Sequence, residues 1–206
     1  MNAPQGSEAW AMERCGLPTA SEYSSILAKG QGLTRKKYLR RIVAEILTGK
    51  PIADSSYGAW QQNLERGHEQ EAEARASYEA ITGNLVQEVG FIRHPTIRTG
   101  CSPDGLIDEG GGCEIKSVIP TVQIETILSG KYPSEHTAQI QGNMLNTGRE
   151  YWDFCSFSPD MPEHLRTYIF RVKRDEAYIK TLTAEVVVFL AEIDELVAKL
   201  NQRRDV

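Results

Sequence analysis

The stretch TGCSPDGLIDEGGGCEIKSV, residues 99–118, decides the fold of this chain. It places an acid, Asp104, in a Pro-Asp-Gly turn and follows it with two short strand patterns. A glycine-rich turn at 110–112 separates these patterns, and the second one carries Glu114 and Lys116. We expect this turn to fold the second strand back beside the segment that carries Asp104, which brings two carboxylates together.

The spacing of Glu114 and Lys116 predicts a shared surface. Residues two apart in a strand point to the same side of a sheet, so Ile115 should point into the opposite layer. Two carboxylates that face one point repel each other but suit a hard divalent cation that prefers oxygen ligands. The pattern therefore predicts a Mg²⁺ or Mn²⁺ site that binds a phosphate and activates a water, with Lys116 orienting the attacking hydroxide.

An ordinary surface hairpin is the alternative, because a turn Asp and an exposed Glu-x-Lys pair are common in such hairpins. The surroundings favour a buried platform instead. Ser102, Pro103 and Gly105 fix a tight turn around Asp104, and the flanks of Glu114 are Gly, Cys, Ile and Val rather than polar surface residues.

Periodicity over the rest of the chain predicts alternating blocks of helix and strand. A capped helix is expected from Thr19, where TASE offers a Thr cap and a Glu three residues on. Further helices are expected at 33–48, 57–81, 121–128, 136–146 and 175–201. Strands are expected at 85–91, 97–102, 105–108, 113–118, 151–157 and 166–172. The order predicts one α/β domain over 1–206, with a central mixed β-sheet flanked by α-helices.

The composition is that of a soluble globular protein, with 40% hydrophobic and 25% charged residues. The longest apolar run, 184–191, is too short to cross a bilayer, and the amino terminus lacks the layout of a signal peptide. No membrane association and a cytoplasmic location are expected. The net charge of -5 argues only weakly against DNA, since a nuclease needs positive charge only along its DNA track.

The four cysteines are scattered without a CxxC pair, which indicates buried, reduced thiols rather than a zinc site or a disulfide framework. The four histidines also lack the spacing that places two imidazoles on one metal. The basic run TRKKYLRR, 34–41, has two interpretations: a solvated helix face or an edge that contacts phosphates. The sequence does not choose between them.

Five blocks of sequence resemble one known family. They are GSEAWAMERCGLPTAS at 6–21, LERGHEQEAEARASYE at 64–79, CSPDG at 101–105, EIKS at 114–117 and TAQIQGNML at 137–145. In this order they resemble the PD-(D/E)xK nucleases, and within them the lambda exonuclease or YqaJ-like viral recombinase branch. The resemblance implies a restriction-endonuclease-like core.

The resemblance also implies metal ligands. Asp104 and Glu114 would ligate two Mg²⁺ ions, for which Mn²⁺ is a possible substitute, with the backbone carbonyl of Ile115 assisting. Glu71 matches the family's additional acid, which serves the second metal or its water shell. By sequence alone a Glu on a helix surface is unremarkable.

Two further positions concern the attacking water. Lys116 matches the family's catalytic lysine, and Gln139 matches its glutamine near the nucleophilic water. Gln141 is the alternative for the glutamine.

A third set resembles the family's pocket for the 5′-terminal phosphate. Arg14 and Ser21 match it, and Ser102 would add a hydroxyl contact to the same strand. A guanidinium grips phosphate bidentately, and the amides at a helix start complete an anion site. Leu64 matches an apolar wedge that parts the terminal base pairs, although a single Leu is more often part of a core.

One segment departs from the family pattern. The region between Lys116 and Gln139 is shorter than in lambda exonuclease, and no arginine follows soon after Lys116. Lys131 is the candidate for the missing phosphate contact.

The resemblance implies a processive 5′-to-3′ exonuclease that acts on double-stranded DNA ends, releases 5′-mononucleotides and leaves 3′ single-stranded overhangs. It implies a homotrimeric ring around the DNA and a single-strand annealing protein as partner in phage-type recombination. Two alternatives remain: another PD-(D/E)xK enzyme, either an endonuclease or a helicase-associated nuclease, and a non-catalytic DNA-end clamp. A clamp has no need for converging acids.

Overall fold

The structure is a computed structural model. It describes the backbone of residues 3–28, 32–52 and 57–205, and the side chains of these residues except 57–69 and 204–205. Within this part, no helix is long and apolar enough to cross a membrane.

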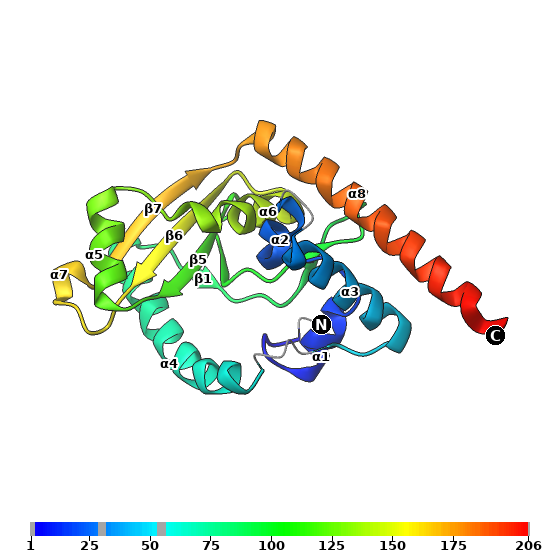
Figure 1. The fold of residues 1–206 in the computed structure, drawn as a ribbon. Coiled ribbons are helices and arrows are strands. Elements are labelled where there is room, and N and C mark those ends of the chain that lie inside the picture. The colour runs from blue at the N-terminus through cyan, green and yellow to red at the C-terminus, as the bar shows by residue number, and fades with distance from the viewer. Residues whose placement is uncertain (1–2, 29–31, 53–56, 206) are drawn as a thin grey trace.

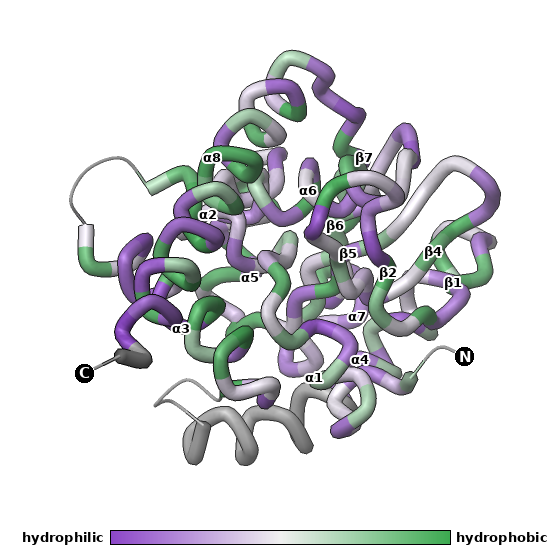
Figure 2. Tube along the Cα trace, turned by 90° about the vertical axis from the view of Figure 1, so that its right-hand side faces the viewer, coloured by the Kyte–Doolittle hydropathy of each residue, from purple (hydrophilic) through white to green (hydrophobic). Residues whose placement is uncertain are grey.

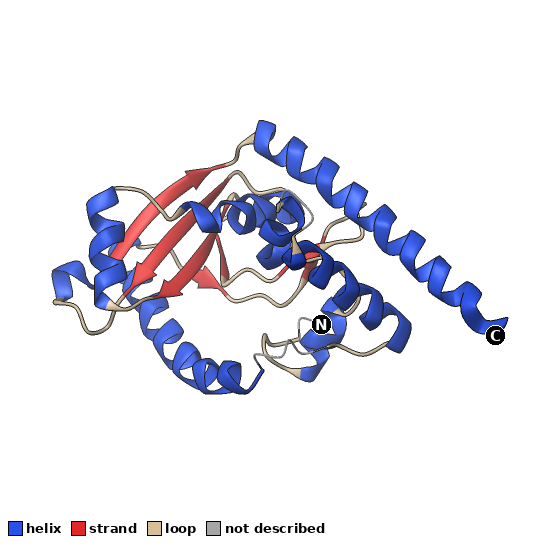
Figure 3. Cartoon of the chain, in the orientation of Figure 1, coloured by secondary structure: helices blue, strands red, loops and turns tan. Residues whose placement is uncertain are grey.

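A five-stranded mixed sheet forms the centre of the molecule (Figure 3). Its strands, in spatial order, are β1 (Val86–Gln87), β4 (Gly105–Ile107), β5 (Gly111–Ser117), β6 (Tyr151–Phe157) and β7 (Thr167–Lys173). β5 and β6 run parallel, with Glu114 opposite Phe154, and the other neighbours are antiparallel. The expected central mixed sheet is therefore confirmed.

A second sheet has only two short antiparallel strands, β2 (Ile92–Arg93) and β3 (Gly100–Cys101). Of the strands expected at 85–91 and 97–102, only β1 and β3 form, and β2 was not predicted. The segment between β2 and β3 bonds to itself, with the backbone N–H groups of Thr96 and Ile97 donating to the His94 ring, which shortens the strand expected at 97–102.

The helices follow the predicted order with additions at both ends. They are α1 (Glu8–Arg14), η1 (Ala20–Glu22), α2 (Tyr23–Leu27), α3 (Leu33–Thr48), α4 (Tyr57–Thr82), α5 (Pro120–Ser129), η2 (Ser134–His136), α6 (Thr137–Thr147), α7 (Glu163–Arg166), α8 (Glu176–Asn201) and η3 (Gln202–Asp205). Thr19 precedes η1 but makes no side-chain cap bond, and Glu22 binds Arg41 and Ser25 instead. The expected capping box was therefore wrong.

The helices cover both faces of the sheet (Figure 1). α4 packs on one face against β5, β6 and β7, while α5 and α6 contact the sheet elsewhere and α6 also packs on η1, α2 and α8. The long α8 runs along α2 and α3 toward the carboxyl end. Along the tube of α8 hydrophobic and hydrophilic segments alternate (Figure 2), as one buried face of a helix requires.

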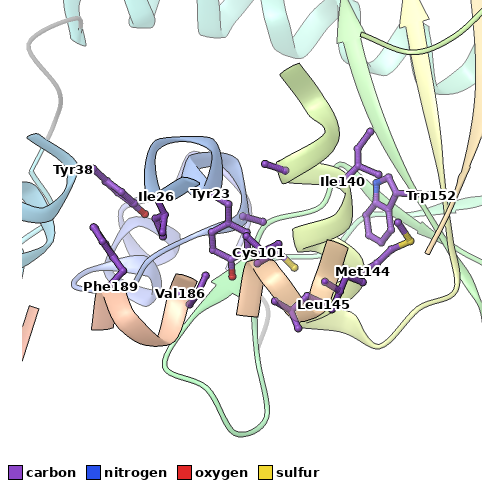
Figure 4. Packing of buried hydrophobic residues seen from close by; sticks show 14 of the residues in the cluster. Tyr23, Ile26, Tyr38, Cys101, Ile140, Met144, Leu145, Trp152, Val186 and Phe189 are labelled. Atoms are coloured by element: carbon purple, nitrogen blue, oxygen red, sulfur yellow. The ribbon is translucent and has the colours of Figure 1, made fainter. Parts of the chain in front are cut away.

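The buried hydrophobic side chains form two groups, one on each face of the sheet. The larger one joins α2, α3, α6 and α8 to β6, and its fully buried members include Tyr23, Ile140, Trp152 and Phe189 (Figure 4). The smaller one lies between α4 and the sheet and includes Tyr78 and Ile115. Burial of large side chains of this kind stabilises a fold by about 1.5–3 kcal/mol each, so these groups hold α4 and α6 firmly on the sheet.

The turn between β4 and β5 lies earlier than predicted. Gly111 and Gly112 already belong to β5, where they pair with Ile107 and Leu106. The chain reverses at Asp108, whose φ is 43°, and its Oδ1 accepts hydrogen bonds from the backbone N–H groups of Gly110 (2.7 Å) and Gly111 (2.9 Å). An aspartate side chain that bonds to the following backbone makes the turn itself, which frees two glycines for the strand.

Candidate active site

Asp104 lies in the loop between β3 and β4. Its Oδ2 accepts a hydrogen bond of 2.7 Å from the backbone N–H of Ile115 in β5, which ties the loop to the sheet. The next residue must be glycine, because a Cβ at Gly105 would collide with the side chain of Val86 on β1. The Pro-Asp-Gly turn therefore positions the carboxylate rigidly beside β5.

Glu114 is fully buried at the middle of β5. Its Oε1 accepts hydrogen bonds of 2.5 Å from both Lys116 Nζ and Gln139 Nε2, and its Oε2 accepts one of 3.1 Å from Asn143 Nδ2. Ile115 packs on the opposite side with the residues of α4. The predicted division of the strand into a polar and an apolar face is confirmed.

The charges of these groups influence one another. Burial, followed by the negative charge of Glu114, raises the pKa of Asp104 to about 7, while Lys116 and the Ile115 amide act in the opposite direction. Burial alone would lower the pKa of Lys116, but Glu114 and Asp104 together raise it above its ordinary value. The site thus has two acids that repel each other and one lysine that stays protonated.

This donor set fits a hard divalent cation. Asp104 and Glu114 present carboxylate oxygens to one region, and a cation there would remove the repulsion that raises the pKa of Asp104. In the part of the chain with described side chains, no group of three or more His, Cys, Asp or Glu residues is arranged to hold a metal ion. Any ion would therefore also need oxygens from the backbone, water or the substrate.

Glu71 lies at the border of this region on α4. Its Oε1 accepts a hydrogen bond of 3.3 Å from Arg75 Nη2, and its charge contributes to the raised pKa of Lys116. Glu71, the acid that the resemblance predicts, therefore lies near enough to Lys116 to raise its pKa. Arg75 pairs with both Glu71 and Glu88.

Two polar residues of the site were not anticipated. His136 precedes α6, stacks on Phe154 with ring centroids 5.3 Å apart, and has a pKa lowered by burial and by the nearby Lys116. Asn143 binds Glu114 directly. The four-residue spacing of Gln139 and Asn143 on a predicted helix was the signal that could have found Asn143.

The residues expected to bind a 5′-phosphate lie together. Arg14 at the end of α1 donates to Ser102 Oγ (3.0 Å) and to Thr19 Oγ1 (3.4 Å), and Thr19 Oγ1 lies 3.3 Å from Ser21 Oγ. The guanidinium also stacks on Trp10, 4.2 Å from the ring centroid. Thr19 and Trp10, absent from the predicted set, therefore connect its members.

A cavity of about 620 Å³ opens beside Arg14. Its walls come from α1, the 15–22 segment, α3 and residues 51–52, and include Thr19, Glu22, Arg41 and Glu45. Asp104 and Glu114 do not line it. Arg14 thus lines this cavity and also contacts Ser102 in the loop that carries Asp104.

Part of the basic run supports the fold. Arg35 forms two hydrogen bonds to Glu192 on α8, of 2.6 and 2.9 Å, and Arg41 pairs with Glu22 at 2.8 Å. For these two residues a structural role is clear. Lys131 is exposed in the turn after α5, and Leu64 lies outside the residues whose side chains are described.

The thiols agree in part with expectation. Cys101, Cys113 and Cys155 are buried and Cys15 is partly exposed, and all four are free. Burial raises the pKa of each of them.

Comparison with known families explains this arrangement. The family model described as the YqaJ-like viral recombinase domain matches residues 9–150. The chain belongs to this family. The match begins in α1 and ends just before β6, so it includes every predicted site residue. No curated protein sequence matches the chain.

Solved structures with the same fold match almost the whole chain. An alkaline exonuclease (LHK-Exo) from Laribacter hongkongensis is 35% identical, with a TM-score of 0.86, and the match covers 96% of this chain and 97% of that one. The same enzyme in complex with dAMP matches with 36% identity and a TM-score of 0.85, with the same coverage. A phage-related exonuclease from Haemophilus somnus 129PT shares the fold at 13% identity, with a TM-score of 0.67 over 89% of this chain and 96% of that one.

Proposed function

We propose that this protein is a Mg²⁺-dependent exonuclease that degrades one strand of double-stranded DNA processively from the 5′ end. It releases 5′-mononucleotides and leaves 3′ single-stranded overhangs. Membership of the YqaJ-like viral recombinase family and the likeness to an alkaline exonuclease support a nuclease that acts on DNA ends.

One observation carries the proposal: Ser102 of the proposed phosphate pocket and Asp104, one of the two acids, lie on the same loop between β3 and β4. Ser102, which accepts from Arg14, and Asp104, which is tied to β5, are two residues apart. A strand whose 5′-phosphate contacts Arg14 and Ser102 would therefore place a nearby phosphodiester at Asp104 and Glu114. This arrangement suits cutting just inside a 5′ end.

The residues divide the chemistry between them. Asp104, Glu114 and the carbonyl of Ile115 would hold Mg²⁺, with Mn²⁺ as a possible substitute and Glu71 beside a second ion. When bound, such an ion supplies an activated water and neutralises charge on the phosphate. Lys116, kept protonated by two carboxylates, is suited to orient the attacking hydroxide and to stabilise the developing negative charge. Gln139 donates to Oε1 of Glu114, the oxygen that Lys116 also contacts, and would contact the attacking water.

The family also suggests how the protein works in the cell. We propose a homotrimeric ring that encloses the DNA, and a single-strand annealing protein that binds the exposed 3′ tail during phage-type recombination. The setting would be the cytoplasm of a bacterial host, with the gene carried by a phage or prophage.

The test uses a linear duplex labelled at either 5′ or 3′ end. We expect mononucleotide release that requires Mg²⁺, starts at 5′-phosphorylated ends and disappears in Asp104→Ala. Nicking of closed circular DNA would indicate an endonuclease. DNA binding without hydrolysis would indicate an end clamp. Full activity in Lys116→Ala would contradict the mechanism.

A further inference from the structure

α6 brings two amides to the same carboxylate. Gln139 and Asn143 are one helical turn apart, so their side chains lie on one face of the helix, above β5. Gln139 donates to Oε1 of Glu114, and Asn143 donates to Oε2 at 3.1 Å. The amide of Asn143 thus binds the carboxylate oxygen that neither Lys116 nor Gln139 contacts.

This contact is deeply buried. Asn143 is 1% exposed and Glu114 is 0% exposed. An amide at this depth loses its water partners, so it is stable there only when protein atoms replace them. The bond also receives charge assistance from the carboxylate, and such bonds are stronger than neutral ones. Rotation of the Glu114 carboxylate would leave the Asn143 amide without this acceptor, which fixes the plane of the carboxylate.

Another asparagine of α6 shows what a purely structural role looks like. Asn146 is 3% exposed and donates to the hydroxyl of Tyr23 (3.0 Å) and to the carbonyl of Gly142 (2.7 Å). The first contact joins α6 to α2, the second lies within α6, and neither involves the site. Asn143 and Asn146 are therefore alike in residue type, helix and burial, and they differ in the groups to which they donate.

We propose that Asn143 is a positioning residue for Glu114: its amide holds Oε2 so that the carboxylate keeps one orientation for metal binding. This inference rests on the proposed metal-dependent function. It concerns an outer contact of a ligand, and loss of such a contact costs roughly 10–100-fold in metal affinity. Asn143 does not need to touch the metal or the DNA.

The experiment compares the whole protein with Asn143→Leu, which keeps the number and branching of the side-chain heavy atoms and removes the donor, and with Asn146→Leu as the matched control. Binding of Mn²⁺ is measured by electron paramagnetic resonance. We expect roughly tenfold or greater weakening in Asn143→Leu and a change of less than about twofold in Asn146→Leu. In exonuclease assays, Asn143→Leu should need more Mg²⁺ than the wild type to reach half of its maximal rate. At saturating Mg²⁺ the rates of the two proteins should differ less.

The outcomes separate this inference from the function on which it rests. Wild-type affinity in Asn143→Leu, in a protein whose wild type binds Mn²⁺, overturns the positioning role and leaves the proposed function intact. Equal weakening in both variants also overturns it, because a general loosening of α6 would explain both. A wild type that binds no Mn²⁺ overturns the metal assignment and this inference together.

A measurement on the wild type covers the case in which the Leu variant does not fold. The NMR signal of the Asn143 side-chain amide should shift when Mg²⁺ is added, because this amide donates to Glu114, which would bind the ion. The amide of Asn146 serves as the reference and should move less. Saturating Mg²⁺ that leaves the Asn143 signal unmoved would overturn the proposal.

Discussion

Glu114 illustrates how a buried charge is stabilised in this protein. The carboxylate is fully buried, and its partners are one ammonium and two amides. Lys116 is the only one of these partners that supplies positive charge, and its side chain keeps 31% exposure. In the absence of a metal ion, Lys116 therefore acts as the counter-ion of Glu114.

Removal of that counter-ion should destabilise the metal-free protein. Because Lys116 is partly exposed and two amides remain, we expect Lys116→Met to lower the unfolding free energy by about 2–3 kcal/mol, below or at the edge of the 3–5 kcal/mol typical of a broken buried pair. The double variant Glu114→Gln, Lys116→Met should recover most of this loss. Urea denaturation in EDTA measures both, and equal stability of Lys116→Met and the wild type would contradict the counter-ion role.

Asp104 is expected to reduce stability at alkaline pH. Its pKa is raised from 3.8 to about 7, so the folded state disfavours the charged form. The unfolded carboxyl loses its proton at lower pH, and stability falls as pH rises through this interval and stays reduced above it. Asp104→Asn keeps the acceptor for the Ile115 amide and removes the charge.

Asp104→Asn should therefore be more stable than the wild type in EDTA at pH 8, and the difference should shrink toward pH 5. Each 1 kcal/mol of this stability difference should raise the Tm of Asp104→Asn by about 2–4 °C over that of the wild type, as is usual for a domain of this size. Thermal unfolding at several pH values checks this, and saturating Mg²⁺ should reduce the difference. A constant difference at all pH values would exclude the charge as its cause.

At the scale of elements, the sequence predicts best the long helices and the buried strands. α3, α4, β6 and α8 lie within about one residue of their predicted bounds. α3 and α8 repeat the helical period several times, α4 is rich in residues that favour helices, and β6 is buried along nearly its whole length. α1 was missed because it buries none of its seven residues and has no such period. Its signal was local: Ser7 caps the helix by accepting from the Trp10 N–H, with Glu8 in the first turn.

The site divides in the same way. Strand alternation predicts that Glu114 and Lys116 share a face, because that depends on neighbours in one strand. The contact of Asn143 with Glu114 depends on α6 meeting β5, which no local pattern encodes. The turn at Asp108 was misplaced because three glycines suggest a turn more strongly than an aspartate that bonds to its own backbone.

The packing of α6 on α2 depends on a glycine. A Cβ at Gly142 would collide with the ring of Tyr23, which is fully buried. Alanine favours a helix by about 1 kcal/mol over glycine, whereas overpacking a core costs about 1–3 kcal/mol. We expect Gly142→Ala to lower the unfolding free energy. Denaturant unfolding measures it, and a variant more stable than the wild type would show that Tyr23 yields easily.

At the scale of the whole molecule, hydrogen bonds fix the amino-terminal segment to the segment that leads to Asp104. The Thr99 hydroxyl donates to the Pro18 carbonyl at 2.7 Å, and the Tyr23 hydroxyl lies 2.6 Å from Thr99 Oγ1. Both bonds are buried and lie next to β3, a few residues before Asp104. The proposed phosphate pocket and the acids therefore belong to one rigid unit, although more than eighty residues of sequence separate them.

This connection makes the distance between the proposed end-binding pocket and the proposed cutting site a property of the fold, and it predicts which end of DNA is degraded. Arg14→Ala should lose the preference for 5′-phosphorylated over 5′-hydroxyl duplexes by about 10–100-fold, the equivalent of the 1.5–3 kcal/mol of a charged hydrogen bond. Arg93→Ala is the matched control, because Arg93 is exposed and donates to the Glu13 carbonyl of the same helix. Initial rates on the two duplexes give the preference.

Residual hydrolysis should persist in Arg14→Ala with shorter runs per binding event, since the acids remain in place. Complete inactivity on both duplexes in a folded Arg14→Ala would instead mean that Arg14 acts in the chemical step, and an equal loss of preference in Arg93→Ala would reduce its role to general attraction of DNA.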